Sequence, residues 1–261
     1  MIGLFDSGVG GLTVADAFAK RVPGAALALV ADQAHVPYGG RPVDEVAAFA
    51  AAQSDLLFEQ GAELVVMACN LSSAVALANA RARHGADRVF GMVEAGAVAA
   101  RARTRRGRVG VLATSGTVST HAYGLALAAL EVTEVACPDF VPLVEAGDIE
   151  SPKSKAAVDR ALAPLRRADC DVVILGCTHY PFLLPTLRLL GPEFDFVDPA
   201  QALAEGLASR IRPGPSRMWT TGDRLRFRSQ LARWCPKLQP LLGEARWCEG
   251  RLLVDEAQAA D

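Results

Sequence analysis

Two cysteines, Cys69 and Cys177, hold equivalent places in the sequence. Cys69 directly follows the apolar run ELVVMA, and Cys177 directly follows DVVILG. Short runs of this kind predict buried strands, so we expect each thiol where a strand ends and the chain turns into a helix. The carboxyl end of a strand is a common functional position in α/β proteins, and a nearby helix N-terminus lowers the pKa of a thiol. A packing role in the core is the alternative for either cysteine taken alone.

One sequence offset relates the surroundings of the two cysteines. A spacing of 108 residues separates Ser7 from Ser115 and also Cys69 from Cys177. The same spacing aligns ELVVMACN with DVVILGCT and VPYGG with VEAGD. Four agreements in one register favour an internal duplication over chance. Small polar or basic side chains follow both cysteines: Asn70, Ser72 and Ser73 after the first, and Thr178 and His179 after the second.

Two thiols that face each other across a substrate suit a reaction that inverts a carbon centre. A single base returns a proton to the face from which it came, whereas two bases let one thiolate remove a proton while the opposite thiol donates another. Disulfide exchange is an alternative, but it usually employs a CxxC pair. Zinc binding by Cys69, Cys177 and His179 is another, but C-x-H with a distant Cys is not a usual ligand spacing. The spacing therefore favours proton transfer at carbon.

Two glycine-rich segments could bind the rest of a substrate. DSGVGG begins at Asp6 and lacks the Lys of a phosphate-binding P-loop, but its backbone N–H groups suit a carboxylate, and Asp6 could bind an ammonium group or tune a thiol. HVPYGG offers the Tyr38 hydroxyl and a close backbone approach at Gly39. A helix-capping turn and a surface turn are the respective alternatives. His179 is a candidate proton partner of Cys177 because the ordinary pKa of histidine is near neutrality.

Composition excludes several classes of protein. The 261 residues are 51% apolar, enough for a large core, and 27 basic residues against 29 acidic ones give a net charge of -2. The sequence therefore shows no electrostatic footprint for nucleic acid or an anionic membrane, and the RARTRRGR stretch is expected to be a solvated linker or helix end. No signal peptide or membrane-spanning run is recognisable, which predicts a cytoplasmic protein with reduced cysteines.

Alternation of strand-like and helix-like segments sets the fold class. IGLF, ALALVA and ELVVMA alternate with Ala- and Leu-rich stretches of helical period, and the alternation begins again at RVGVLA. This pattern predicts two similar doubly wound α/β domains related by pseudo-twofold symmetry, with the active site in the cleft between them. We place the first domain at residues 1–95 plus 214–261, with the C-terminal segment packing back on it, and the second at 96–213.

The motifs together resemble the glutamate racemase family, within the wider aspartate/glutamate racemases. The resemblance covers nearly the whole chain and rests on FDSGVGGLTV, VPYGGRP, ACN, VGVLATSGTV, ACPDFVPLVEAG, LGCTHYP, FVDPA and TTGD. It implies racemisation of L-glutamate to D-glutamate for peptidoglycan synthesis, without pyridoxal phosphate, metal or other cofactor. The implied partner is the small-molecule substrate, with no nucleic acid or membrane, and a homodimer is left open.

The resemblance also implies roles for individual residues. Cys69 and Cys177 would be the opposed thiol acid and base, and Asp6, His179 and Glu145 would support them. The residues implied to hold the substrate are Asp6, Ser7, Tyr38, Gly39, Asn70, Leu71, Thr178 and His179.

One residue departs from the family pattern. The family usually has CNTAS after the first cysteine, whereas this chain has CNLSS, so Leu71 stands where a Thr hydroxyl would contact a substrate carboxylate. Ser72 or Ser73 could compensate. A lost hydrogen bond to a charged group costs about 1.5 to 3 kcal/mol. Racemisation of another acidic amino acid such as aspartate, and a non-catalytic glutamate-binding regulatory protein on the same scaffold, therefore stay open.

Overall fold

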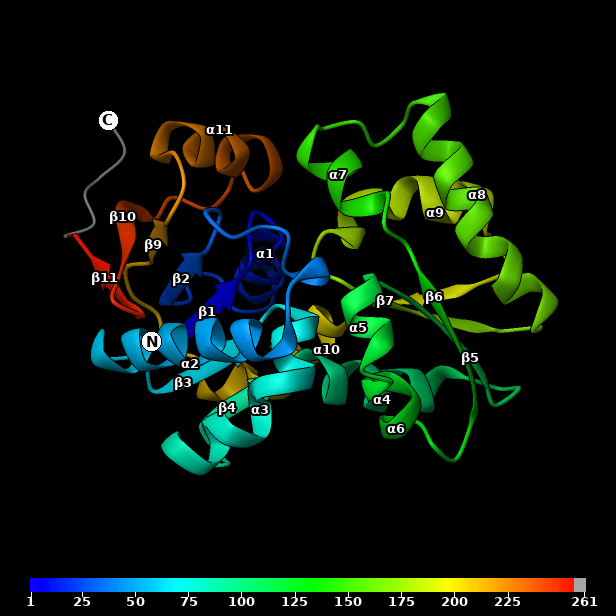
Figure 1. Cartoon of the computed structure of the whole chain (residues 1–261), viewed down its shortest axis with the longest axis horizontal. Coiled ribbons are helices and arrows are strands. Elements are labelled where there is room, and N and C mark those ends of the chain that lie inside the picture. Colours follow the sequence, from blue (N-terminus) through cyan, green and yellow to red (C-terminus); the bar gives the residue numbers. More distant parts are fainter. Residues whose placement is uncertain (256–261) are drawn as a thin grey trace.

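The computed structural model describes residues 1–255, which form two sheets with helices on both faces of each (Figure 1). Neighbouring strands run parallel, except that the last two strands of the chain pair antiparallel. The first sheet has the spatial order β11 (Arg251–Val254), β10 (Leu241–Cys248), β9 (Arg217–Thr220), β2 (Leu27–Ala31), β1 (Ile2–Asp6), β3 (Leu64–Met67) and β4 (Val89–Gly91). The second has the order β6 (Glu131–Ala136), β5 (Arg108–Ala113), β7 (Val172–Gly176) and β8 (Asp195–Val197).

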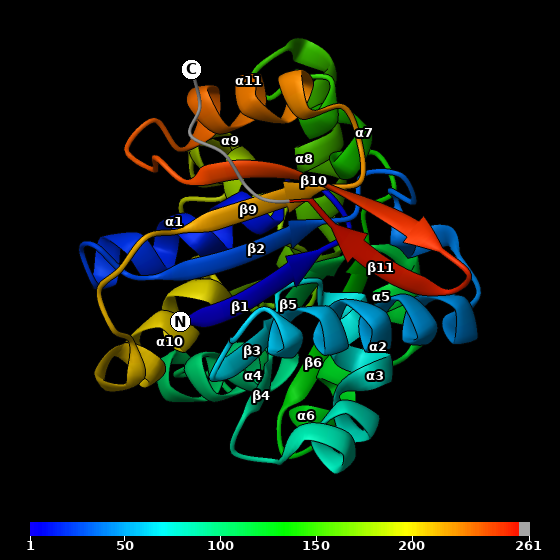
Figure 2. The ribbon, with the colours of Figure 1, turned by 90° about the vertical axis from the view of Figure 1, so that its left-hand side faces the viewer.

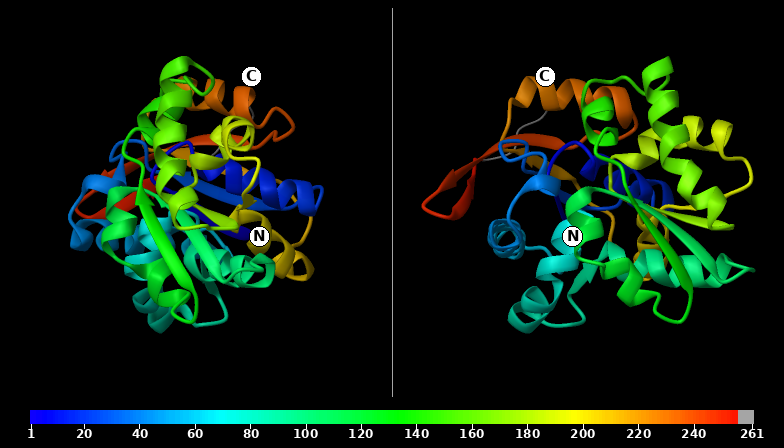
Figure 3. Two further views of the ribbon diagram at one scale, coloured as in Figure 1. Left: turned by 90° about the vertical axis from the view of Figure 1, so that its right-hand side faces the viewer. Right: turned by 45° about the vertical axis from the view of Figure 1, so that its right-hand side comes forward.

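The two sheets repeat one topology. The order β2-β1-β3-β4 in the first sheet recurs as β6-β5-β7-β8 in the second, which Figure 3 shows from its outer side in the left-hand view. The connections repeat as well, because α2 (Val43–Glu59) joins β2 to β3 and α8 (Pro152–Arg167) joins β6 to β7. The prediction of two similar α/β units is confirmed.

Helices cover both faces of the two sheets. No helix within the described residues is long and apolar enough to cross a bilayer. Besides α2 and α8, the helices are α1 (Gly11–Arg21), α3 (Asn70–His84), α4 (Met92–Arg103), α5 (Ser115–Ser119), α6 (Ala122–Ala126), α7 (Phe140–Glu145), α9 (Leu184–Leu190), α10 (Pro199–Leu207) and α11 (Arg224–Trp234). Three short 3-10 helices span Tyr38–Gly40, Tyr180–Leu183 and Ala208–Arg210.

Strand β1 shows why the first sheet is buried on both faces. All five of its residues are buried, and successive side chains point to opposite faces. Leu4 packs in the core under α1, together with Leu12 and Phe18 of that helix, while Phe5 packs in the core under α2 and α3. Burial of one such side chain contributes about 1.5 to 3 kcal/mol, so β1 is held from both sides.

The C-terminal segment returns to the first sheet. Strand β9 pairs with β2, and β10 pairs with β9 (Figure 2). Helix α10, which follows the last strand of the second sheet, packs against α1 and α4, and its Leu203 and Leu207 lie in the same core as Ile2 and Leu4. Helix α10 thus packs with the first sheet although it lies within residues 96–213. The domain bounds of 1–95 plus 214–261 and of 96–213 stay a prediction.

The arginine-rich stretch between the two units is fixed by one carboxylate. Asp171 accepts hydrogen bonds from the Thr104 hydroxyl at 2.6 Å and from the backbone N–H groups of Arg105 and Arg106 at 2.6 and 3.0 Å. Partial burial alone would raise the pKa of Asp171, but these donors hold its pKa below the usual value. The expected linker is thus an ordered turn between α4 and β5.

Replacing Asp171 should test this turn. Asp171→Ala removes three hydrogen bonds to one carboxylate, so we expect the free energy of unfolding to fall by about 1 to 2 kcal/mol at pH 7. A carboxyl whose pKa is lowered by folding stabilises the protein above its unfolded value of about 3.9, and this stabilisation is lost as the pH falls through the folded pKa. The difference from the parent in urea unfolding should therefore shrink below about pH 4.

The matched control is Asp195→Ala, which removes an exposed carboxylate that pairs with Arg103 at 3.4 Å. Exposed pairs contribute little, so a loss below about 0.5 kcal/mol is expected. Equal losses in the two variants at pH 7 would contradict the role given to Asp171.

Candidate active site

A small cavity lies where the carboxyl ends of the two sheets meet. It contains both Cys69 and Cys177, which are 7% and 8% exposed. The cavity volume is about 20 Å³, so its side chains close tightly around it. Its lining residues come from both units: Ser7, Pro37, Tyr38, Gly39, Cys69, Asn70, Leu71, Thr114, Thr117, Val141, Gly176, Cys177, Thr178 and His179.

Cys69 stands at the N-terminus of α3 as its capping residue. Burial and the nearby Asp6 carboxylate raise the pKa of the Cys69 thiol to about 12, and the backbone N–H of Ser72 lowers this pKa by less. The expectation that a helix N-terminus lowers the pKa is therefore wrong for Cys69, because desolvation and a like charge outweigh the helix. Cys69 is held as a neutral thiol, able to donate a proton.

Cys177 has a histidine and a carboxylate beside it. Nδ1 of His179 lies 3.9 Å from Cys177 Sγ, and Nε2 lies 2.9 Å from Oε1 of Glu145. Burial alone would lower the pKa of His179, but Cys177, Glu145 and Asp6 raise this pKa to about 10. Burial raises the pKa of Glu145, yet His179 outweighs it, and the net pKa is lowered.

The order of these three groups determines where the proton is exchanged. An ionised Glu145 accepts a hydrogen bond, so Nε2 of His179 carries a hydrogen and Nδ1 faces the sulfur. The imidazole can then exchange a proton with Cys177 through Nδ1 while Glu145 holds the ring in place. Glu145, implied only by the family resemblance, thus lies next to His179 in the structure.

Asp6 connects the two units below the cavity. Its fully buried carboxylate accepts hydrogen bonds from the Gly8 N–H and from the Thr178 hydroxyl, both at 3.0 Å. Burial raises the pKa of Asp6, although the charge of His179 and these donors oppose the shift. Thr13 of α1 adds a second link, because its hydroxyl donates to the backbone oxygen of Thr178 at 2.9 Å. The DSGVGG segment therefore positions the residue that follows Cys177.

Tyr38 lines the cavity, but its hydroxyl is already hydrogen-bonded within the protein. The hydroxyl donates to the buried Asp32 carboxylate at 2.6 Å and accepts from Gln53 at 3.0 Å. Because Asp32 takes its proton and Gln53 occupies one lone pair, the hydroxyl has no proton to donate to a substrate, and the substrate contact of Tyr38 stays a prediction. Gly39 lies against Thr114, since a Cβ placed there would fall 2.8 Å from Cβ of Thr114, and its approach to a substrate stays a prediction.

Asn70 and Leu71 present opposite chemistry to the cavity. The Oδ1 atom of Asn70 accepts from the Tyr123 hydroxyl at 2.6 Å, while Nδ2 is buried without a hydrogen-bond partner among residues 1–255. A buried donor of this kind is costly unless it binds something, so Nδ2 is suited to a substrate oxygen. Leu71 is buried beside Tyr38 and Cys69 and offers only an apolar surface.

Thr114 and Thr117 are cavity residues that the sequence reasoning missed. Thr114 caps α5 by accepting the Thr117 N–H at 3.3 Å, and the two hydroxyls lie 3.0 Å apart. The signal was present in the sequence, because the spacing of 108 residues that relates the cysteines also places Thr114 on Asp6. Pro37, Val141 and Gly176 also line the cavity without having been singled out.

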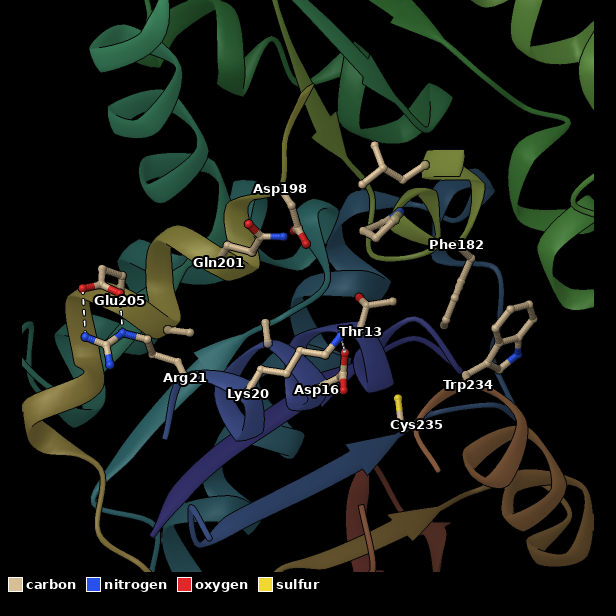
Figure 4. A pocket seen from close by; sticks show the side chains of 14 residues that line it. Thr13, Asp16, Lys20, Arg21, Phe182, Asp198, Gln201, Glu205, Trp234 and Cys235 are labelled. Atoms are coloured by element: carbon tan, nitrogen blue, oxygen red, sulfur yellow. Dashed lines mark hydrogen bonds and ion pairs between the residues drawn. The ribbon is translucent and has the colours of Figure 1, made fainter. Parts of the chain in front are cut away.

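A larger cavity, lined in part by Thr13, does not contain Cys69 or Cys177 (Figure 4). Its volume is about 510 Å³, and its charged side chains are largely paired with one another. Lys20 contacts Asp16 at 2.5 Å, and Arg21 pairs with Glu205. The thiol chemistry therefore belongs to the smaller cavity.

The side chains at the smaller cavity are of types that can transfer protons. Across residues 1–255, no three His, Cys, Asp or Glu side chains are grouped so that they could hold a metal ion, and the six cysteines are free. Two thiols, one from each unit, line one cavity together with an imidazole and two carboxylates below and behind it. This arrangement can remove a proton from carbon and replace it.

Comparison with known proteins assigns the family. The profile of the family described as Asp/Glu/Hydantoin racemase matches residues 13–207. The chain belongs to this family. A glutamate racemase from Desulforudis audaxviator is 46% identical over 206 residues, covering 77% of this chain and 75% of that protein. A glutamate racemase from Gloeobacter violaceus is 40% identical over 247 residues, covering 90% and 92%.

Solved structures of the family have the same fold. A glutamate racemase isoform from Bacillus anthracis has a TM-score of 0.87 at 32% identity, covering 93% of this chain and 96% of that one. The Francisella tularensis glutamate racemase, solved in complex with D-glutamate, has a TM-score of 0.84 at 26% identity, covering 92% and 95%. The chain is thus an isomerase of the glutamate racemase type.

Gly10 should tolerate no side chain, because it lies against the site. A Cβ at Gly10 would fall 2.1 Å from Oγ1 of Thr178 and 2.7 Å from Nδ1 of His179, whereas a Cβ at Gly40 would meet nothing within 4 Å. We expect Gly10→Ala to lower the free energy of unfolding by about 1 to 3 kcal/mol, and Gly40→Ala to change it by less than about 0.5 kcal/mol. Urea unfolding of both variants measures the difference. Equal stabilities would show that Thr178 and His179 move aside without cost.

Proposed function

We propose that this racemase interconverts L- and D-glutamate by a two-base mechanism without a cofactor, with Cys69 and Cys177 as the opposed acid and base. The observation that carries the proposal is that the two thiols, each at the end of a strand in a different sheet, line one cavity. The relatives named glutamate racemase support the substrate, as do the solved complexes of the Francisella tularensis enzyme with D-glutamate and the Escherichia coli enzyme with L-glutamate.

The reaction needs one thiolate and one thiol at the same time. The thiolate removes the α-proton from one face of glutamate, and the opposite thiol donates its proton to the other face. The product leaves with the two sulfurs in exchanged protonation states, ready for the reverse reaction. Cys69, whose pKa is about 12, carries its proton in the free protein and so has one to give, and His179, 3.9 Å from Cys177, exchanges a proton with that sulfur.

Charge develops on the substrate as its α-proton leaves. Nδ2 of Asn70 is a fixed donor without a partner among the described residues, so it can bind a carboxylate oxygen as negative charge spreads onto it. We assign Asp6 a supporting role, because its carboxylate accepts a hydrogen bond from Thr178, which lines the cavity. We include in the proposal that the D-glutamate serves peptidoglycan synthesis in the cytoplasm; a homodimer stays a prediction.

Deuterium exchange tests the proposed reaction. With L-glutamate in deuterated water, the D-glutamate formed early should carry deuterium at Cα, because the donor thiol has exchanged with solvent. The L-glutamate recovered at the same time should stay largely unlabelled, because its own face meets the other sulfur. Mass spectrometry after chiral separation measures both. Product that retains the original hydrogen would contradict the two-base mechanism, and a panel including aspartate decides the substrate.

Cysteine variants assign the bases. Cys69→Ser and Cys177→Ser replace each thiol by a much weaker acid, so each variant should lose about 100-fold or more in kcat. Cys248→Ser alters an exposed cysteine outside the cavity and serves as the control. Glutamate binding with no turnover in the unaltered protein, seen by calorimetry, would instead indicate a non-catalytic binding protein.

Leu71 offers a test of the substrate contact. Leu71→Thr places a hydroxyl in the cavity, so we expect glutamate to bind about tenfold more tightly through one added hydrogen bond to a carboxylate. Valine has nearly the same shape as threonine but no hydroxyl, so the Leu71→Val variant should bind glutamate no more tightly than the parent. Calorimetry with both glutamate enantiomers measures this. Equal affinities of the Thr and Val variants would mean that Leu71 does not face the carboxylate.

A further inference from the structure

Glu145, which orients His179, is itself held by a residue from the other unit. Gln230 of α11 donates through Nε2 to Oε2 of Glu145 at 3.3 Å. Its Oε1 accepts from Nε2 of Gln33, which follows β2, at 2.8 Å. Figures 1 and 3 show α11 beside the segment that carries α7, which ends at Glu145. Gln230 therefore reaches across from the first unit to the carboxylate behind the Cys177 half of the site.

The hydrogen bonds leading to Glu145 alternate donor and acceptor without a break. The Gly222 N–H donates to Oγ1 of Thr220 at 3.0 Å, and the Thr220 hydroxyl donates to Oε1 of Gln33 at 2.8 Å. Nε2 of Gln33 then donates to Oε1 of Gln230, and Nε2 of Gln230 donates in turn to Glu145. Thr220 is fully buried at the end of β9, so the chain of bonds begins on a rigid strand.

A positive charge competes with Gln230 for the same carboxylate. Nη2 of Arg226, one turn earlier on α11, lies 4.0 Å from Oε2 of Glu145. The other titratable groups around the pair are Cys177 and Asp6, which act on His179. Arg226 is exposed, whereas Gln230 is hydrogen-bonded to both Glu145 and Gln33, so the neutral amide fixes the direction of the carboxylate better than the solvent-facing guanidinium does.

Cys69 has no histidine and carboxylate at the positions equivalent to His179 and Glu145. The spacing of 108 residues places Leu71 on His179 and Pro37 on Glu145. Neither a leucine nor a proline side chain can pass a proton or hold an imidazole. A residue that acts through Glu145 therefore acts on one of the two bases only.

We propose that Gln230 is a positioning residue for the Cys177 half of the reaction, holding Glu145 against His179 from the opposite unit. The proposal rests on the function proposed above. Without the Gln230 amide, Oε2 of Glu145 keeps only the distant Arg226 as a side-chain partner among residues 1–255, so the carboxylate can rotate and Oε1 is no longer held toward Nε2 of His179. The imidazolium is then less stabilised, and proton exchange with Cys177 slows.

The test compares Gln230→Leu with Gln239→Leu, the same change at an exposed position beyond α11. For Gln230→Leu we expect kcat to fall about tenfold, as for loss of a hydrogen bond to a charged group, with KM changed less than about twofold because Gln230 does not line the cavity. Gln239→Leu should match the parent. Gln33→Leu breaks the same chain of bonds further from Glu145 and should lower kcat in the same sense but by less.

Isotope effects distinguish this role from a general loss of structure. The step in which Cys177 takes or gives a proton becomes slower, whereas the step at Cys69 does not. The primary isotope effect on kcat/KM with α-deuterated substrate should therefore rise for the enantiomer deprotonated by Cys177 and fall for the other. Equal isotope effects for the two enantiomers, unchanged from the parent, would overturn the proposal.

Titration of His179 tests the positioning without turnover. The pKa of His179, about 10 in the parent, should fall in Gln230→Leu and stay unchanged in Gln239→Leu, as measured by NMR of the imidazole. An unchanged pKa in Gln230→Leu overturns the proposal even if the protein is inactive. A lack of racemisation by the unaltered protein counts against the proposed function instead, so the two failures are distinguishable.

Discussion

The buried hydrogen bond between Asp6 and Thr178 is the contact on which the site depends. It joins the last residue of β1 to the residue that follows Cys177, and so sets the end of one sheet against the end of the other. A buried carboxylate without donors would be strongly destabilising, so Asp6 keeps Thr178 in place as much as Thr178 satisfies Asp6. The absence of a side chain at Gly10 is what lets Thr178 and His179 approach this closely.

The duplicated fold has given its two thiols different surroundings. The strand order and the position of the cysteine are the same in both units. The residues that follow differ: an imidazole and a carboxylate stand behind Cys177, whereas Cys69 has Leu71 beside it and the Asp6 carboxylate close by. The repeated topology thus supplies two cysteines at equivalent positions, and the neighbouring side chains give them unequal surroundings. The two cysteines therefore differ in their neighbours before any substrate binds.

The sequence carried the features that depend on local pattern. Hydrophobic runs located β1, β3, β5 and β7, and the repeat of the cysteine position was visible as one spacing. Features that depend on burial were not readable: the thiol of Cys69 has a raised pKa because it is desolvated, and the Tyr38 hydroxyl is engaged by Asp32. Contacts between distant segments were also missed. Gln230 and Glu145 meet across 85 residues of chain, and no periodicity marks either of them.

The tight closure of the cavity has a kinetic consequence. A space of about 20 Å³ holds roughly one water molecule, far less than an amino acid needs. Entry of an amino acid therefore requires lining residues of the two units to move apart, and the bonds from Asp6 to Thr178 and from Gln230 to Glu145 resist that movement. The hydrogen bonds that order the surroundings of Cys177 are thus the same bonds that resist opening, so a more firmly held site also releases its ligand more slowly.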